Sequence, residues 1–211
     1  MSVGILNTEN QPESFAFTDQ NLAEAKRIIA KYPEGRQQSA VLPLLQMAQR
    51  QHDNWLPRAA MDVVAEMLEM PKIRVYEVAT FYSMFNLQPV GENFVQVCTT
   101  TPCWLAGSDD IVKVCKRRMG KTERSISADG KFTWMEVECL GACVNAPMVQ
   151  INDDYYEDLT PEIFESIVDA LDKGDTPAPG SQSGRRGSMA QRGPTSLADK
   201  ARAAGIKMAK E

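Results

Sequence analysis

Two close pairs of cysteines constrain this chain more than any other feature. Cys98 and Cys103 form a C-x4-C pattern and, after 35 intervening residues, Cys139 and Cys143 form a C-x3-C pattern. Each pair begins where a run of alternating apolar residues ends, which predicts a loop leaving the end of a strand. Loops that leave neighbouring strands at one edge of a sheet can face each other, so four thiolates could converge on one point.

Four converging thiolates are the ligand set of an iron–sulfur cluster, whose ligand loops are rich in small residues because backbone N–H groups approach the sulfurs. Thr99–Thr101, Gly141 and Ala142 supply such residues. Structural zinc is an alternative, although its cysteines are usually spaced more tightly. Buried packing thiols or redox thiols are further alternatives, but the C-x-x-C pattern of thiol–disulfide enzymes is absent. The spacing does not exclude a four-iron cluster.

The number of cysteines and histidines narrows the chemistry further. Five cysteines, an odd count, argue against a disulfide framework. The fifth, Cys115, is expected to be a small buried side chain in a helix. The single histidine, His52, excludes zinc sites with three histidines and Rieske-type centres with two.

Charge is distributed unevenly along the chain. Residues 1–173 carry a net charge of −9 and residues 174–211 carry +4. We expect no nucleic-acid partner, because no overall basic footprint exists. Arginines among the glycines of the tail suggest a strand-like arm lying on an acidic partner, with a disordered solubilising tail as the alternative; they are Arg185, Arg186 and Arg192.

The chain lacks the signals of a membrane span or a leader. No apolar run approaches the roughly 18 residues of a membrane span, and residues 1–18 contain no Lys or Arg. We therefore expect the protein to stay in a bacterial-type cytoplasm.

Hydrophobic periodicity divides the chain into four parts. A flexible lead over residues 1–17 precedes a helical domain over residues 18–85, an α/β domain follows over residues 86–174, and a basic tail rich in Gly, Pro and Ser covers residues 175–211. Expected helices of the second part cover residues 18–32, 38–53, 58–69 and 71–82, and their first turns are marked by Thr18, Pro57 and Pro71.

The α/β domain is expected to combine hairpins and helices. Period-two patterns predict a hairpin of residues 85–89 and 93–98 around Gly91, a strand over 131–138, and a hairpin of residues 148–152 and 155–158. Expected helices run from a Ser108 cap to Met119 and from Thr160 to Gly174, with a weak last helix over 196–210.

The cysteine segments resemble a known family. Cys98-Thr-Thr-Thr-Pro-Cys103 and the stretch from Glu136 to Asn152 closely resemble the thioredoxin-like [2Fe–2S] subunit of respiratory complex I, the small partner of its flavin-bearing subunit. Tyr32–Arg36 and Val75–Tyr82 are similar to the helical N-terminal part of that subunit. The resemblance covers about residues 18–180.

The resemblance implies a fold, a cofactor and partners. The fold is an N-terminal helical bundle followed by a thioredoxin-like [2Fe–2S] ferredoxin domain, and Cys98, Cys103, Cys139 and Cys143 ligate one [2Fe–2S] cluster. The cluster exchanges one electron with FMN on the NADH-binding partner subunit. Further partners are the iron–sulfur subunits of the peripheral arm, on the cytoplasmic side of the bacterial inner membrane. Membrane association arises only through the complex.

Catalysis by the isolated chain is not expected. No G-x-G-x-x-G motif follows a strand and no Walker A loop is present, so the chain has no NADH or flavin site of its own. It would be an enzyme only as a subunit of NADH:quinone oxidoreductase. Alternatives are the equivalent subunit of an NAD-linked formate dehydrogenase or NAD-reducing hydrogenase, a structural zinc-binding adaptor, and a free-standing thioredoxin-like ferredoxin.

Other candidate residues have plain structural interpretations. Asp109-Asp110 is expected at a helix start, Asp153-Asp154 in a turn, and His52 in a structural position at a helix end. Trp104 follows Cys103 directly, so it either shields the cluster from water or serves ordinary packing.

Overall fold

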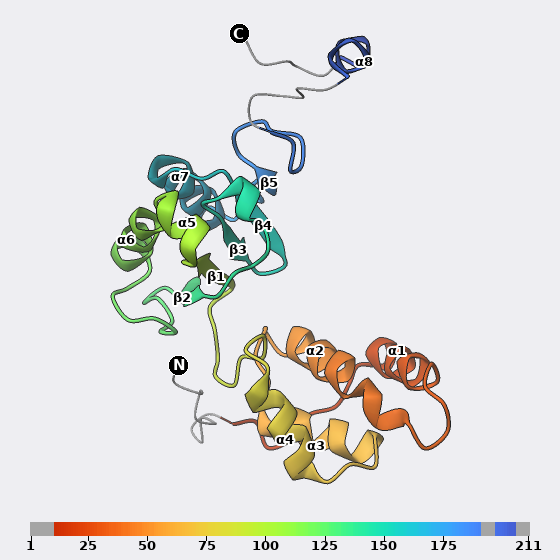
Figure 1. The fold of residues 1–211 in the computed structure, drawn as a ribbon. Coiled ribbons are helices and arrows are strands. Elements are labelled where there is room, and N and C mark those ends of the chain that lie inside the picture. Colours follow the sequence, from red (N-terminus) through yellow and green to blue (C-terminus); the bar gives the residue numbers. More distant parts are fainter. Residues whose placement is uncertain (1–10, 191–196, 206–211) are drawn as a thin grey trace. The chain divides into compact units, whose positions relative to one another are not determined.

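The computed structural model describes residues 11–190 and 197–205. The chain forms two compact units, Met1–Val90 and Gly91–Glu211. Helices make up the first unit, and a five-stranded sheet with helices makes up the second (Figure 1).

The helical unit begins close to the expected positions. The Thr18 side chain accepts a hydrogen bond from the backbone N–H of Asn21 at 3.3 Å, so it is the N-cap of the first helix. Pro57 and Pro71 stand directly before two later helices, where a missing N–H costs no helical bond. The helices of this unit are α1 (Asp19–Ile29), α2 (Val41–Gln51), α3 (Arg58–Met67) and α4 (Lys72–Phe81), with the 3₁₀ turn η1 (Gln37–Ala40) before α2.

One apolar core holds these helices together. Its fully buried side chains include Leu44, Leu45, Met61, Val64 and Val75, contributed by α2, α3 and α4. Burial of each such side chain stabilises the unit by roughly 1.5–3 kcal/mol.

The segment expected to be a flexible lead is packed against this core where it is described. Phe15 and Phe17 lie against the core in edge-to-face contact with each other, with ring centroids 5.2 Å apart. The Gln51 side chain donates to the Ala16 carbonyl at 2.8 Å. The burial of two aromatic side chains and this hydrogen bond therefore hold the segment against the helices. Residues 1–10 lie outside the described part.

The expected hairpin of residues 85–89 and 93–98 is wrong. Only its second half is a strand, and that strand pairs with strands later in the chain. Phe85 and Leu87 are buried in the core of the helical unit instead. Their alternation with Asn86 and Gln88 thus reflects two anchors in a helical core, and alternation alone does not distinguish this from a strand.

The sheet of the second unit has the order β2-β1-β3-β4-β5. Strand β1 pairs in parallel with β2 and antiparallel with β3, β3 pairs antiparallel with β4, and β4 pairs in parallel with β5. The expected strand over 131–138 and the later hairpin are confirmed. The strands are β1 (Asn93–Cys98), β2 (Phe132–Val137), β3 (Val149–Ile151), β4 (Asp154–Glu157) and β5 (Gly180–Ser181).

Helices α6 (Ser108–Arg118) and α7 (Pro161–Asp172) pack on one face of this sheet. Alternate residues of the strands, such as Val95 and Val97 of β1 and Trp134 of β2, share a core with Ile111 of α6 and Phe164 of α7. The Trp134 indole N–H donates to the Gly120 carbonyl at 2.8 Å, which satisfies its one polar group. This core leaves the intervening strand residues, Cys98 among them, on the opposite face.

The helix ends of this unit agree with the sequence in one case and differ in another. Thr160 caps α7 by accepting from the Ile163 N–H at 3.3 Å, as expected. Ser108 is not a cap: left-handed Gly107 precedes α6, and Ser108 is its first residue with its hydroxyl buried. The short helix α5 (Thr101–Leu105) and the 3₁₀ turn η2 (Cys143–Asn145) were not expected.

The described part of the tail contains two short elements of regular structure. Residues 180–181 form β5, and a short helix, α8 (Ala198–Ala203), lies within the region of the expected last helix. Residues 191–196 and 206–211 fall outside the described part. None of the described helices is long and apolar enough to cross a membrane.

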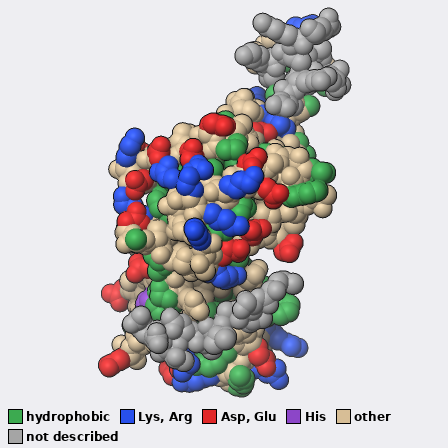
Figure 2. Space-filling view, turned by 90° about the vertical axis from the view of Figure 1, so that its left-hand side faces the viewer, with side chains coloured by type: hydrophobic (Ala, Val, Ile, Leu, Met, Phe, Trp, Pro, Cys, Tyr) green, Lys and Arg blue, Asp and Glu red, His purple; other side chains and the backbone are tan. Residues whose placement is uncertain are grey.

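Charged side chains of both signs alternate on the surface over α6 (Figure 2). Arg118 pairs with Asp169 at 2.5 Å, Arg117 with Glu165, and Lys131 with Asp172 at 2.8 Å. These pairs join α6, and the residue just before β2, to α7, but each is at least partly exposed and contributes at most about 1 kcal/mol.

Candidate metal centre

The parallel pairing of β1 and β2 brings the two cysteine segments to one edge of the sheet. Cys98 is the last residue of β1 and lies opposite Val137, the last residue of β2. The Thr99 N–H donates to the Val137 carbonyl at 3.3 Å, which continues the pairing one residue further. Cys139, two residues beyond β2, therefore emerges beside Cys98.

The first pair of cysteines is buried. Helix α5 begins at Thr101 with Pro102 in its first turn, and this turn carries Cys103 back toward Cys98. Both thiols are 1% exposed and share a small apolar cluster with Met148. The Cys98 N–H donates to the Met148 carbonyl at 3.4 Å, so the residue just before β3 also fixes this end of β1.

The second pair is exposed. Cys139 Sγ and Cys143 Sγ are 3.4 Å apart. Gly141 lies between them at φ +85°, a left-handed conformation that favours glycine, and its N–H donates to Cys139 Sγ at 3.4 Å. The small residues expected from the sequence thus let the backbone approach a sulfur.

Thr100 links the two pairs, a role that sequence reasoning did not assign to it in particular. Its hydroxyl lies 3.4 Å from Cys98 Sγ. The same hydroxyl also helps to lower the pKa of Cys139. The Thr100 hydroxyl therefore lies against Cys98 and also influences the pKa of Cys139 in the other loop.

The electrostatics of the four thiols are those of one joint site. Burial would raise the pKa of Cys98, but hydrogen bonds from the Thr100 side chain and from the Leu140 backbone lower it overall. Burial and the adjacent Cys98 raise the pKa of Cys103 to about 12. The Gly141 N–H and Cys143 lower the pKa of Cys139, whereas Cys139 raises that of Cys143.

In each pair the pKa of one thiol is lowered, and the pKa of the other is raised in part by its neighbour. Like charges at this separation disfavour full ionisation. Positive metal ions reverse that effect, because a coordinating thiol is deprotonated outright. The donor set therefore suits a cationic centre with four thiolate ligands.

The four thiols lie in two pairs: Cys98 and Cys103 share one buried cluster, and Cys139 and Cys143 bring their sulfurs to 3.4 Å. Tetrahedral zinc needs four ligands around one ion, whereas a [2Fe–2S] cluster takes two thiolates on each of its two irons.

The other residues considered from the sequence lie outside this site. Cys115 is fully buried in the core beneath α6, and burial raises its pKa to about 12. His52 follows α2 and packs edge-on against Trp55, with ring centroids 4.7 Å apart. Asp109 and Asp110 lie in the first turn of α6, as expected.

Trp104 is half-exposed on α5, and its indole N–H donates to Asp109 at 3.1 Å. Its indole is therefore oriented by α6. Shielding of a cluster by this side chain stays a prediction.

Arg185 differs from its expected role. Rather than facing an acidic partner, it pairs with Asp158 of the same chain, just after β4. No local sequence signal connects the two residues, because they are joined only through the parallel pairing of β4 with β5.

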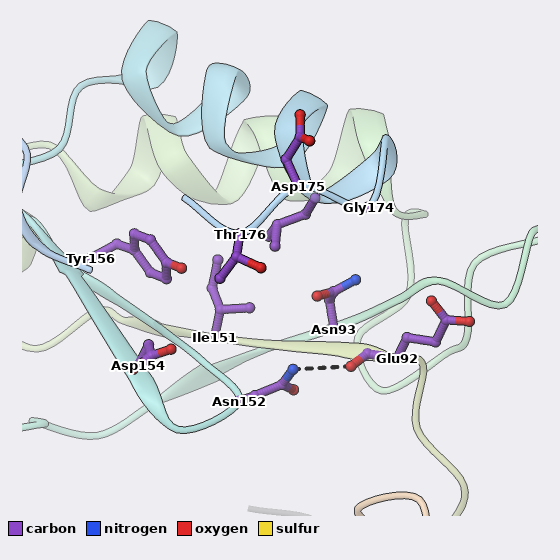
Figure 3. A pocket seen from close by; sticks show the side chains of 10 residues that line it. Glu92, Asn93, Ile151, Asn152, Asp154, Tyr156, Gly174, Asp175 and Thr176 are labelled. Atoms are coloured by element: carbon purple, nitrogen blue, oxygen red, sulfur yellow. Dashed lines mark hydrogen bonds between the residues drawn. The ribbon is translucent and has the colours of Figure 1, made fainter. Parts of the chain in front are cut away.

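A pocket of about 290 Å³ lies at the other end of β1 (Figure 3). Its lining includes the carboxylates of Glu92, Asp154 and Asp175. The Asn152 side chain donates to the Glu92 carbonyl at 3.0 Å on one side of it. No cysteine lines this pocket, so it is separate from the thiol site.

A model of the thioredoxin-like [2Fe–2S] ferredoxin family matches residues 25–172. The chain belongs to this family. The expected fold class, early helices followed by a thioredoxin-like ferredoxin domain, is confirmed, and so is a [2Fe–2S] cluster as the cofactor of the family.

Curated relatives of this ferredoxin family are close in sequence. An NADH-quinone oxidoreductase subunit of Rickettsia bellii is 62% identical over 158 residues, which cover 75% of this chain and 95% of the relative. The same oxidoreductase subunit of Rickettsia felis is 60% identical over 156 residues, covering 74% and 93%. The resemblance to the small subunit of respiratory complex I is thereby confirmed.

Among solved structures, an NAD+-reducing [NiFe]-hydrogenase in the air-oxidised state is similar in fold, with a TM-score of 0.53 at 18% identity. The match covers 62% of this chain and 23% of the hydrogenase chain. At this identity the likeness concerns the fold alone.

Proposed function

We propose that this chain is the electron-transfer subunit of a bacterial NADH-quinone oxidoreductase, respiratory complex I. Cys98, Cys103, Cys139 and Cys143 would hold a [2Fe–2S] cluster that exchanges one electron with FMN on the NADH-oxidising partner subunit. The convergence of both cysteine pairs at one edge of the sheet carries this proposal. The identity of 62% to an NADH-quinone oxidoreductase subunit supports the choice of complex.

When bound, the cluster takes up and returns single electrons. The residues around it have distinct tasks. The burial of Cys98 and Cys103 beside Met148 excludes water from one side. The Thr100 hydroxyl and the Gly141 N–H donate to sulfur, which stabilises the negative charge that reduction adds.

The exposed side of the site is suited to a partner. Cys139 and Cys143 are exposed, and apolar side chains next to the cysteines in sequence are exposed too: Val144 by 61%, Trp104 by 53% and Leu105 by 73%. Exposed apolar surface of this kind is typical of docking sites. We assign it to the flavin subunit, within a peripheral arm on the cytoplasmic side of the membrane that also holds further iron–sulfur subunits.

Two other functions give different experimental outcomes. An equivalent subunit of an NAD-reducing hydrogenase or a formate dehydrogenase would carry the same cluster with different partners. The fold likeness to the hydrogenase supports only the shared architecture. A structural zinc-binding adaptor would be colourless and contain no sulfide.

Anaerobic purification of the full chain tests the cluster and its ligands. Two irons and two sulfides per chain, with an EPR signal of a spin-half pair after reduction, support the proposal. Cys139→Ala should abolish that signal, whereas the matched control Cys115→Ala should keep it. Zinc without sulfide would overturn the redox function. Co-purification of the tagged chain with a flavin subunit and a quinone-reducing complex, rather than with a hydrogenase, tests the partner.

A further inference from the structure

The tail passes close to the loop that follows Cys143. Strand β5 adds to the edge of the sheet through Gly180 and Ser181, which lie opposite Tyr156 and Glu157 of β4. The Gln182 N–H donates to the Glu157 carbonyl at 2.9 Å, so the pairing continues into the next residue. The chain that follows β5 is thereby placed beside Asp158 and the 3₁₀ turn that begins at Cys143.

A buried ion pair fixes this placement. Arg185 Nη2 lies 2.7 Å from Asp158 Oδ1, and their side chains are only 9% and 7% exposed. The hydroxyls of Ser181 and Ser183 donate to Asp158 Oδ2 at 2.6 and 3.2 Å. Because both charges are removed from water, the pair is stable only with such additional hydrogen bonds, and loss of one partner leaves an uncompensated buried charge.

The guanidinium also contacts the cysteine loop. Arg185 Nη1 donates to the Val144 carbonyl at 3.0 Å, one residue after Cys143. The next residue, Asn145, is buried and donates through Nδ2 to the Gly187 carbonyl at 3.0 Å and to Glu157 at 2.6 Å. The two residues after Cys143 are thus each tied to the tail.

We propose that Arg185 is a positioning residue for the second cysteine pair: anchored on Asp158, it holds the Val144 carbonyl and so fixes where Cys143 presents its sulfur. This inference rests on the proposed function, since it assigns a supporting contact to the cluster site. The role depends on the planar guanidinium group of arginine, which donates to Asp158 and to the Val144 carbonyl at once in a fixed geometry.

We expect Arg185 to affect the position of the cysteine loop more than the electrostatic field at the sulfurs. Its charge is balanced by Asp158 at 2.7 Å, so the pair adds little net field at the sulfurs. The contact with Val144 instead limits how far the exposed loop can open, and residues that orient metal ligands typically change metal affinity 10–100-fold when they are replaced.

Arg185→Gln and Arg186→Gln form a matched pair of variants. Both remove one positive charge at adjacent positions, but Arg186 is exposed, and its side chain forms no hydrogen bond or ion pair with the residues that the structure describes. The full chain, loaded with its cluster, is exposed to an iron chelator. We expect about 10-fold faster iron release and shifted EPR g values for Arg185→Gln. Arg186→Gln should match the wild type. Equal release and equal spectra for both variants would overturn the proposal.

Two further variants separate geometry from charge and from folding. Arg185→Lys keeps the charge but replaces the planar fork with a single ammonium nitrogen, so it should also release iron faster. Wild-type behaviour would contradict the role of the fork. If Arg185→Gln fails to fold, Ser181→Ala weakens the same pair without unpairing a charge. Unchanged iron release for Ser181→Ala would then count against the proposal. A wild-type chain that binds no cluster would instead refute the proposed function.

Discussion

The Thr100 hydroxyl lies 3.4 Å from Cys98 Sγ, at the start of the loop between the first two cysteines. When Cys98 is a thiolate, the hydroxyl is the only possible donor of this pair. A hydrogen bond to sulfur favours the more negative state of a cluster, which is the reduced one.

Thr100→Val should therefore lower the reduction potential of the cluster. If the bond favours the reduced state by about 1 kcal/mol, the potential falls by about 40 mV. Redox titration followed by EPR measures the change. Thr101→Val, an exposed neighbour of the same shape, is the control and should leave the potential in place. A higher potential for Thr100→Val would contradict the direction of this hydrogen bond.

The five cysteines should differ sharply in reactivity. Burial raises the pKa of Cys115 to about 12, so at neutral pH its thiol is protonated and covered by the α6 core. We expect a thiol reagent to modify Cys139 and Cys143 in the cluster-free folded chain but Cys115 only after unfolding. Mass spectrometry of the labelled peptides gives the order. Early labelling of Cys115 would show that the α6 core opens locally.

Acid should weaken the helical unit through Asp62. Burial alone would raise the pKa of this carboxyl, but hydrogen bonds from Lys72 and Tyr76 lower it below its ordinary 3.8. A carboxyl with a lowered pKa in the folded state stabilises above its ordinary value and loses that contribution as pH falls through the folded value. The melting temperatures of wild type and Asp62→Asn should therefore differ most at neutral pH and converge as the pH falls below 3.8. A difference independent of pH would mean that the charge of Asp62 is irrelevant.

Gly91 marks a close approach between two backbones. A Cβ at this position would lie 2.7 Å from the backbone N and C of Phe132, the first residue of β2, and the Gly91 N–H donates to Thr133 at 2.9 Å. Gly91→Ala should destabilise the ferredoxin unit by roughly 1–3 kcal/mol. Melting followed by cluster absorbance detects the loss, and Glu92→Ala at the exposed next position is the control. An unchanged melting midpoint would mean that β2 shifts to make room for the Cβ without loss of stability.

Local sequence signals predicted the helices and several strands well. Thr18 and Thr160 cap helices as expected, because a cap depends on residues within one turn. The strand over β2 and the hairpin of β3 and β4 were also found, since their pattern and turn are local. The four candidate ligands could be predicted for the same reason, because each pair lies within a short motif of five or six residues.

The features that sequence reasoning missed depend on distant residues. Phe85 and Leu87 alternate like a strand but are anchors in a helical core, and only the packing of the helices shows this. The contact of Arg185 with Val144 spans 41 positions and follows from β5 joining the sheet. Ser108 resembles a cap, yet Gly107 supplies the turn into α6, so the hydroxyl is not needed there.

The crossover from β1 through α6 to β2 has a consequence for biogenesis. The two cysteine segments are 35 residues apart in sequence and meet only when β1 and β2 pair in parallel. A cluster bound to both segments would join them as a covalent cross-link does. The loss of conformational entropy would raise the free energy of the unfolded chain by roughly 3–4 kcal/mol, on the entropy estimate used for disulfides. Iron and sulfide would thus be inserted only into a chain whose β1 and β2 have already paired, because a chain without this pairing offers at most two of the four cysteines at one place.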